Sequence, residues 1–275
     1  MAGVKVREYT ELAAIVGDER IPTGTGVRKA TTPDQLKAFI GSSVIAPKTN
    51  AALLFDDFLD IRTSRLTNST TTLTGVPAAA IAAAGIDFIG AAQLRLDSAA
   101  TGANTLYSMI DPSLNDAHTV GAFDKIVYTT RIYIPSTKPA IGLGVGNKKY
   151  ITGLYRGNFA AVGEAAMPCI AALVWSPDSA FFRLQHSTNQ FVATDVTPAQ
   201  DTVYLVRIEW VKATHSLTLY IDNVQKATAT LSNYDSSKSI IPLFGSVSGA
   251  WTGNTSSDIW ADYMSMAVES SADRF

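Results

Sequence analysis

Alternating apolar and polar residues dominate the chain from residue 118 to the C-terminus, in runs separated by turn residues. In the clearest run, VYLVRIEWV at 203–211, alternation places Tyr204 and Trp210 on one apolar face. Arg207 and Glu209 fall on the opposite, more polar face, where ordinary cross-strand pairing accounts for their charges. The run therefore predicts a strand with one fully apolar side.

Two further runs, LTLYI at 217–221 and VQKATATL at 224–231, repeat the alternation and form a meander with the first. Asp222 and Asn223 tolerate the positive φ angles of a tight turn, so they predict the hairpin that joins the two runs. Strand-like runs recur about every ten residues, with no long helical period between them. This spacing predicts a mainly β protein, an antiparallel β-sandwich or barrel.

The N-terminal region differs in pattern from the rest of the chain. Within residues 1–41, Thr32 and Pro33 open a short helix, whose apolar side includes Leu36, Phe39 and Ile40. This α+β unit is too small to bury a core of its own, so we expect it to dock on another surface. Residues 42–52 are predicted to be a linker, and residues 53–275 form the sandwich.

An alanine-rich tract, PAAAIAAAGIDFIGAA at 77–92, has helix propensity but contains Gly85 and Gly90, so it predicts only a short helix or turn. The segments that follow, QLRLDS and TLYSMI, predict short strands joined by a loop. The tract is also too short and too interrupted to span a membrane, so we expect no membrane partner.

Charge and cysteine content exclude several classes of protein. The formal net charge is -2 and no run of basic residues occurs, so a nucleic-acid partner is not expected. The single cysteine, Cys169, cannot form an internal disulfide, and its apolar surroundings predict a core position.

The chemistry-bearing residues do not form a recognisable catalytic or metal-binding motif. His118, His186 and His215 lie in separate segments without carboxylates at ligand spacing, so no transition-metal site is predicted. A calcium ion held by loop oxygens stays open as an alternative. We therefore expect no cofactor, no catalytic residues and no enzymatic activity.

One enzymatic alternative remains, a lyase-type polysaccharide depolymerase with a sandwich fold. Its proton acceptor and its cations would come from neighbouring strands. The same tyrosines and cations also suit glycan binding without catalysis. The residues concerned are Lys149, Tyr150, Tyr155, Arg156 and His186, of which the last four are the predicted glycan-binding residues.

Three passages resemble known proteins. ELAAIVGDERIPTGTGVRKATTPDQLKAFI resembles the N-terminal module of tailed-bacteriophage virion proteins, and DFIGAAQLRLDSAATGANTLYSM is similar to a segment of phage structural proteins. VYLVRIEWVKATHSLTLYIDNVQ resembles the meander of concanavalin A-like and laminin G-like jelly rolls. In the second passage, Asp97 and Ser98 depart from the usual glycine-containing pattern.

The resemblance implies a virion component, either a capsid decoration protein, a head fibre or a tail fibre, made in the host cytoplasm. It implies an N-terminal tether that binds other virion proteins and a jelly-roll head suited to binding a host surface glycan. It also implies a homotrimer whose three tethers share one core. The expected virion-docking residues are Leu12, Ile21, Pro22, Leu36, Phe39 and Ile40.

Overall fold

The computed structural model describes residues 51–59, 61, 66–67, 73–96, 105–108, 123–135, 149–155, 169–175, 180–187, 190–231, 240–247 and 257–270. The predicted N-terminal module lies outside the described residues, and so do the docking residues assigned to it. Of the predicted linker, Ala51 and Ala52 are described, and both belong to the first strand. The sandwich therefore begins inside the segment that the sequence assigned to the linker.

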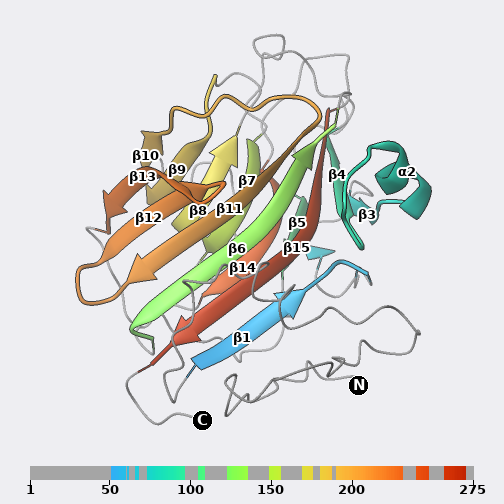
Figure 1. Cartoon of the computed structure of the whole chain (residues 1–275). Coiled ribbons are helices and arrows are strands. Elements are labelled where there is room, and N and C mark those ends of the chain that lie inside the picture. The colour runs from blue at the N-terminus through green and yellow to red at the C-terminus, as the bar shows by residue number, and fades with distance from the viewer. Residues whose placement is uncertain are drawn as a thin grey trace.

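Two antiparallel sheets face one another and form the body of the protein (Figure 1). In the described part of the chain, sheet A has eight strands, in the order β13-β12-β11-β6-β15-β4-β3 with β1 also paired to β15. Its strands are β1 (Ala51–Asp56), β3 (Leu73–Gly75), β4 (Ala92–Leu96), β6 (Lys125–Ile134), β11 (Thr202–Val211), β12 (Ser216–Ile221), β13 (Val224–Thr230) and β15 (Ser257–Glu269).

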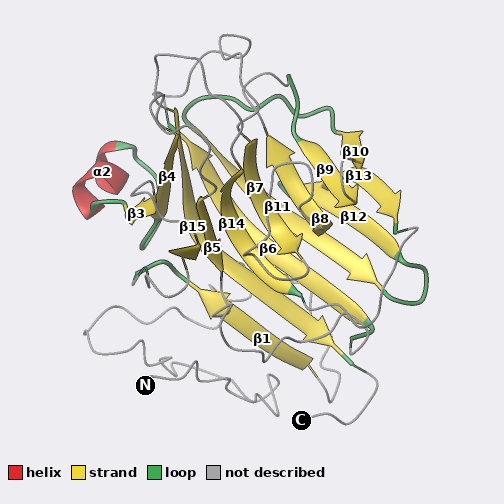
Figure 2. Cartoon of the chain, turned by 180° about the vertical axis from the view of Figure 1, so that it is seen from behind, coloured by secondary structure: helices red, strands yellow, loops and turns green. Residues whose placement is uncertain are grey.

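Sheet B lies behind sheet A in the view of Figure 1, and Figure 2 shows the protein from the opposite side. Sheet B has seven strands among the described residues, in the order β10-β9-β8-β7-β14-β5-β2. Its strands are β2 (Leu66–Thr67), β5 (Thr105–Ser108), β7 (Lys149–Tyr155), β8 (Cys169–Trp175), β9 (Arg183–Ser187), β10 (Gln190–Ala193) and β14 (Ile241–Val247). The antiparallel β-sandwich predicted from the strand spacing is confirmed, and β4 and β5 are the two short strands expected after the alanine-rich tract.

The inner faces of the two sheets share the main hydrophobic core. Tyr204 and Trp210 of β11 lie in this core, as alternation along the strand predicts, together with Val206 and Ile208 between them. Burying side chains of this size stabilises the fold by about 2 kcal/mol each. Trp175 of sheet B is also fully buried here.

The predicted meander is confirmed as β11, β12 and β13. Asp222 and Asn223 have φ angles of 53° and 64°, the left-handed conformation expected of a tight hairpin turn. The Asp222 side chain also accepts a hydrogen bond of 2.9 Å from the backbone N–H of Leu205, which ties the turn to the neighbouring strand.

The short helix expected in the alanine-rich tract is α2 (Ala78–Ala83). Its one buried residue, Ile81, packs with Phe88, Tyr133 and Trp260 into a second apolar cluster, on the outer face of sheet A. Gly85, with a φ of +67°, lies just beyond the end of the helix, where a residue with positive φ commonly ends a helix. The helix thus covers one end of the outer face (Figure 1).

Strand β15 organises sheet A because three other strands pair with it. One of its edges pairs with β6 from Trp260 to Glu269. The opposite edge pairs first with β4, as far as Ala261, and then with β1, from Met264 onward. A β-bulge between Ala261 and Tyr263 places the extra residue, Asp262, at this junction.

Replacing Gly153 with alanine should destabilise the sandwich strongly. Gly153 lies in β7 with a φ of +153°, and a Cβ atom there would stand 2.4 Å from the carbonyl oxygen of Ala171. Overpacking and backbone strain together should lower the free energy of unfolding by about 2 to 5 kcal/mol. Gly75→Ala is the matched control, because nothing lies within 4 Å of its added Cβ. Equal urea midpoints for the two variants would contradict this packing.

Candidate functional site

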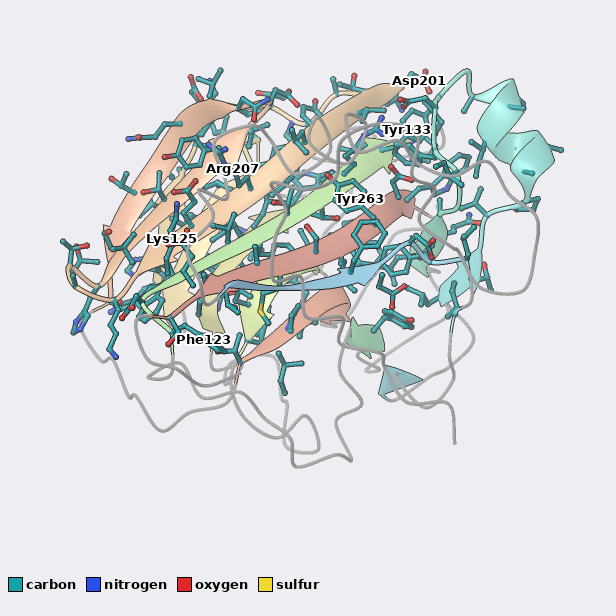
Figure 3. All side chains as sticks on the ribbon, turned by 60° about the horizontal axis from the view of Figure 1, so that its bottom comes forward. Phe123, Lys125, Tyr133, Asp201, Arg207 and Tyr263 are labelled. Atoms are coloured by element: carbon teal, nitrogen blue, oxygen red, sulfur yellow. The ribbon has the colours of Figure 1, made fainter. Side chains whose placement is uncertain are left out.

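The outer face of sheet A, which points away from sheet B, carries a grid of polar and aromatic side chains. The strand registers align them in rows across β12, β11, β6 and β15. One row reads Tyr220, Arg207, Thr129 and Ser265, and the next row along the strands reads Leu205, Arg131 and Tyr263. Lys125, Tyr133, Arg207 and Tyr263 can be followed on this sheet in Figure 3.

The first polar group on this face is the Arg207 cluster, formed by Arg207, Tyr220, Glu209 and Lys125. The Arg207 guanidinium stands 4.1 Å from the ring centroid of Tyr220, its direct cross-strand partner. Its Nε lies 3.4 Å from a carboxylate oxygen of Glu209, and the Nζ of Lys125 lies 3.4 Å from the other oxygen of the same carboxylate. The side chains of Lys125 and Glu209 keep 25% and 18% exposure, so the cluster meets solvent.

The second group, the Arg131 cluster, lies at the β15 bulge and consists of Arg131, Asp87 and Asp262. Arg131 donates from Nη1 to Asp262 at 3.2 Å and from Nη2 to Asp87. Its guanidinium also stands 5.0 Å from the ring centroid of Phe88, a cation–π contact. One arginine therefore links strand β6, the bulge of β15 and the loop that leads into β4.

Burial raises the pKa of the Asp262 carboxyl to about 7, despite the nearby positive charge of Arg131. The negative charges of Asp87 and Asp57 also raise it, while a hydrogen bond from the backbone N–H of Ile89 lowers it. The side chain of Asp262 is only 4% exposed. Strongly perturbed carboxyl groups of this kind mark candidate functional positions, although ion pairs that serve only the fold also perturb pKa values.

Aromatic rings surround the two clusters. The ring of Phe55, at the end of β1, stacks on Tyr263 at 5.7 Å between centroids and stays 43% exposed. Burial raises the pKa of the Tyr263 hydroxyl. Two residues beyond Arg131 on β6, the hydroxyl of Tyr133 donates to a carboxylate oxygen of Asp201 at 3.0 Å, and Figure 3 labels both residues.

The glycan-binding residues predicted from the sequence are not brought together. Tyr150 points into the core, where its ring stacks on Trp175 at 5.1 Å. Tyr155 lies on the outer face of sheet B but is 2% exposed among apolar side chains. His186 is half-buried on β9, where burial lowers its pKa, and strand β8 separates β9 from β7. Arg156 lies outside the described residues.

The expectation that these residues line adjacent strands is therefore corrected. The intervening strand β8 is itself apolar, and side chains five positions apart in an extended strand point to opposite faces. In the sequence, cross-strand pairing alone accounts for Arg207 and Glu209, and no motif marks Arg131 or Asp262. A bulge that moves Asp262 beside Arg131, 131 positions away in the chain, has no local sequence signal.

Neither a metal centre nor a membrane span is visible within the described ranges. No three His, Cys, Asp or Glu side chains in this part of the chain are grouped in a way that could hold a metal ion. Of the helical segments described, none has the length and apolar character required to cross a bilayer.

No protein-family model and no curated protein sequence matches this chain. Among solved structures, the Emp47p carbohydrate recognition domain is similar over 82% of this chain and 99% of its own length, at 11% identity and a TM-score of 0.48. Alginate lyase A1-II′, of polysaccharide lyase family 7, is similar over 66% and 81% of the two chains, at 11% identity and a TM-score of 0.45.

Trypanosoma rangeli sialidase is similar over 66% of this chain, at 9% identity and a TM-score of 0.44. This chain spans only 27% of that sialidase and 15% of another sialidase. Likeness at these identities concerns the fold alone. The prediction that the protein is not an enzyme is corrected, because sialidases and an alginate lyase are among the similar structures.

Replacing Asp262 with asparagine should change how stability depends on pH. The pKa of Asp262 in the fold, about 7, exceeds its ordinary value of 3.8, so between these values the folded protein binds a proton that the unfolded chain has lost. Relative to Asp262→Asn, the free energy of unfolding of the unmodified protein should fall by up to about 4 kcal/mol as pH rises from 4 to 7. Urea unfolding at a series of pH values measures this difference.

Asp195→Asn is the control for this experiment. A hydrogen bond from Lys226 lowers the pKa of the exposed Asp195 carboxyl, so its stabilising effect is present above the ordinary pKa and is lost on acidification. Relative to Asp195→Asn, the free energy of unfolding of the unmodified protein should therefore rise as pH rises. This change is opposite in sign to the one expected relative to Asp262→Asn. Parallel pH curves for Asp262→Asn and the unmodified protein would show that the buried carboxyl is not perturbed.

Proposed function

We propose that the protein is a component of a tailed-bacteriophage virion, and that its sandwich binds a host-surface glycan on the outer face of sheet A. The virion assignment rests on the resemblance of residues 11–40 to phage N-terminal modules. In this proposal residues 1–41 attach the protein to capsid or tail proteins and join three copies, while the sandwich projects toward the host.

The Arg207 cluster is the observation that carries the glycan part of the proposal. A planar guanidinium offers paired donors to sugar hydroxyls, a carboxylate offers paired acceptors, and an aromatic ring offers an apolar face to sugar C–H groups. Arg207, Glu209 and Tyr220 present all three on adjacent outward positions of paired strands. The hairpin and sheet pairing hold these groups in place before a ligand arrives, which favours binding.

The name of the Emp47p domain, a carbohydrate recognition domain, agrees with this proposal without adding an argument for it. The proposed glycan site lies on sheet A and does not include Tyr150 or Tyr155 of sheet B, because both tyrosines are buried.

A second candidate function is cleavage of the bound glycan, and Asp262 is the observation that favours it. With a pKa of about 7, its carboxyl can donate or accept a proton near neutral pH. Arg131 and Tyr263 beside it supply a positive charge and a hydroxyl group. In this alternative, a glycan that crosses from the Arg207 cluster toward β15 would pass these groups.

Glycan binding is tested by titrating the full-length protein with purified bacterial capsular and O-antigen polysaccharides. Tyr220→Ala and Arg207→Lys should each weaken binding about 10-fold, because one removes the ring and the other removes the planar fork but keeps the charge. Phe181→Ala is the matched control, since Phe181 is an aromatic residue that is 41% exposed and lies outside the cluster. Unchanged affinity in both cluster variants would exclude this face as the glycan site.

The same incubations separate binding from cleavage. New reducing ends or unsaturated-uronate absorbance that disappear in Asp262→Asn, while binding persists, would establish the second candidate. Binding without products would support the first.

The virion part of the proposal has its own test. Deletion of residues 1–41 should leave a folded sandwich that no longer associates with phage particles and no longer sediments as a trimer, because these residues form the proposed tether. Mass spectrometry of purified virions made with the full-length or the deleted chain measures the association with particles. A deleted chain that stays on the particle would refute the tether.

A further inference from the structure

Three large apolar side chains are exposed together where β1 and β4 meet along β15. Phe55 is 43% exposed, Leu59 is 40% exposed and Ile89 is 56% exposed. Phe55 stacks on Tyr263, which is the register partner of Arg131 on β6. These three residues, with Asp57 and Asp87, are called the junction surface below.

The loop after β1, which carries Leu59, contacts the loop before β4, which carries Ile89. A Cβ atom on Gly90, the residue after Ile89, would lie 2.7 Å from a side-chain carbon of Leu59 and 2.9 Å from the carbonyl oxygen of Asp57. The loop after β1 therefore packs directly on the loop before β4. The backbone N–H of Ile89 also binds the Asp262 carboxylate, which fixes this loop over the bulge.

Carboxylates outnumber cations among the described side chains of this region. Arg131 pairs with Asp87 and Asp262, and the charges of Asp57 and Asp87 are both felt at Asp262. The side chain of Asp87 is 79% exposed, so much of this charge faces solvent. Apolar groups bordered by carboxylates favour a partner that brings apolar and basic groups together.

This charge also excludes several occupants. Nucleic acid and an anionic membrane surface would meet like charge. A second copy that presents the same surface in a two-fold dimer would place carboxylates against carboxylates. A basic and apolar protein segment meets neither obstacle.

We propose that the junction surface docks a protein segment in which apolar side chains alternate with lysine or arginine. The inference goes beyond the proposed function, because it concerns different residues from the Arg207 cluster and a protein partner rather than a glycan. The apolar side chains of the segment cover Phe55, Leu59 and Ile89, and its cations lie against the exposed carboxylate of Asp87.

The probe is a fluorescent decapeptide of alternating valine and lysine, and its anisotropy is followed as full-length protein is added. Decapeptides of alternating valine and glutamate, and of alternating serine and lysine, serve as controls for charge and for apolar contact. The valine–lysine peptide should bind at least 10-fold more tightly than either control, and 0.5 M salt should weaken it. Equal binding of the three peptides would overturn the proposal.

Variants locate the binding. Ile89→Ser and Asp87→Asn should each weaken binding of the valine–lysine peptide about 5- to 10-fold, while Phe181→Ser, which removes an exposed apolar residue elsewhere, should not. Leu59→Ser provides a second apolar variant if Ile89→Ser changes the thermal midpoint. Unchanged affinity in folded variants would overturn the proposal.

A competition experiment separates this site from the glycan site. A polysaccharide that binds the unmodified protein should not displace the peptide, and Ile89→Ser should keep its polysaccharide affinity. If the polysaccharide displaces the peptide and loses affinity in Ile89→Ser, the surface binds glycan and the protein-docking proposal is wrong, while the proposed function survives.

Discussion

The outer face of sheet A depends on the ion pair that Arg131 makes with Asp262 in the bulge of β15. A strand edge that passes from one partner to another leaves backbone groups without a ladder partner at the changeover, and buried backbone groups require hydrogen bonds. Here the Asp262 carboxylate accepts a hydrogen bond from the backbone of Ile89 just before β4 begins. It thus joins β15, β6 and the loop before β4 at one point.

This arrangement has an energetic cost, because a carboxyl group buried beside other carboxylates resists ionisation. The cost is partly offset by Arg131, whose two ion pairs hold Asp262 and the exposed Asp87. The consequence is a surface with a polar centre, the largely buried Arg207 cluster on one side and exposed apolar side chains on the other.

Much of the fold could be predicted from the sequence. The alternation at 203–231 predicts the three strands and the core face of β11, and Asp222 and Asn223 predict the hairpin. These predictions succeed because each depends on a pattern of only a few consecutive residues. The site could not be predicted in the same way. Arg131 and Asp262 meet only because β6 and β15 pair, and the bulge at Asp262 departs from the alternation on which strand prediction relies.

The predicted glycan residues fail for a related reason. Tyr150 and Tyr155 look accessible in a polar segment, but their exposure depends on which elements cover β7, and both are buried.

Nuclear magnetic resonance titration of the Asp262 side-chain carboxyl and the Ile89 amide tests the central interaction most directly. The account predicts that both signals move with one shared midpoint near pH 7, because the amide binds the carboxylate whose pKa burial raises to about 7. A midpoint for Asp262 near its ordinary value of 3.8, or an Ile89 amide that does not respond to pH, would contradict it.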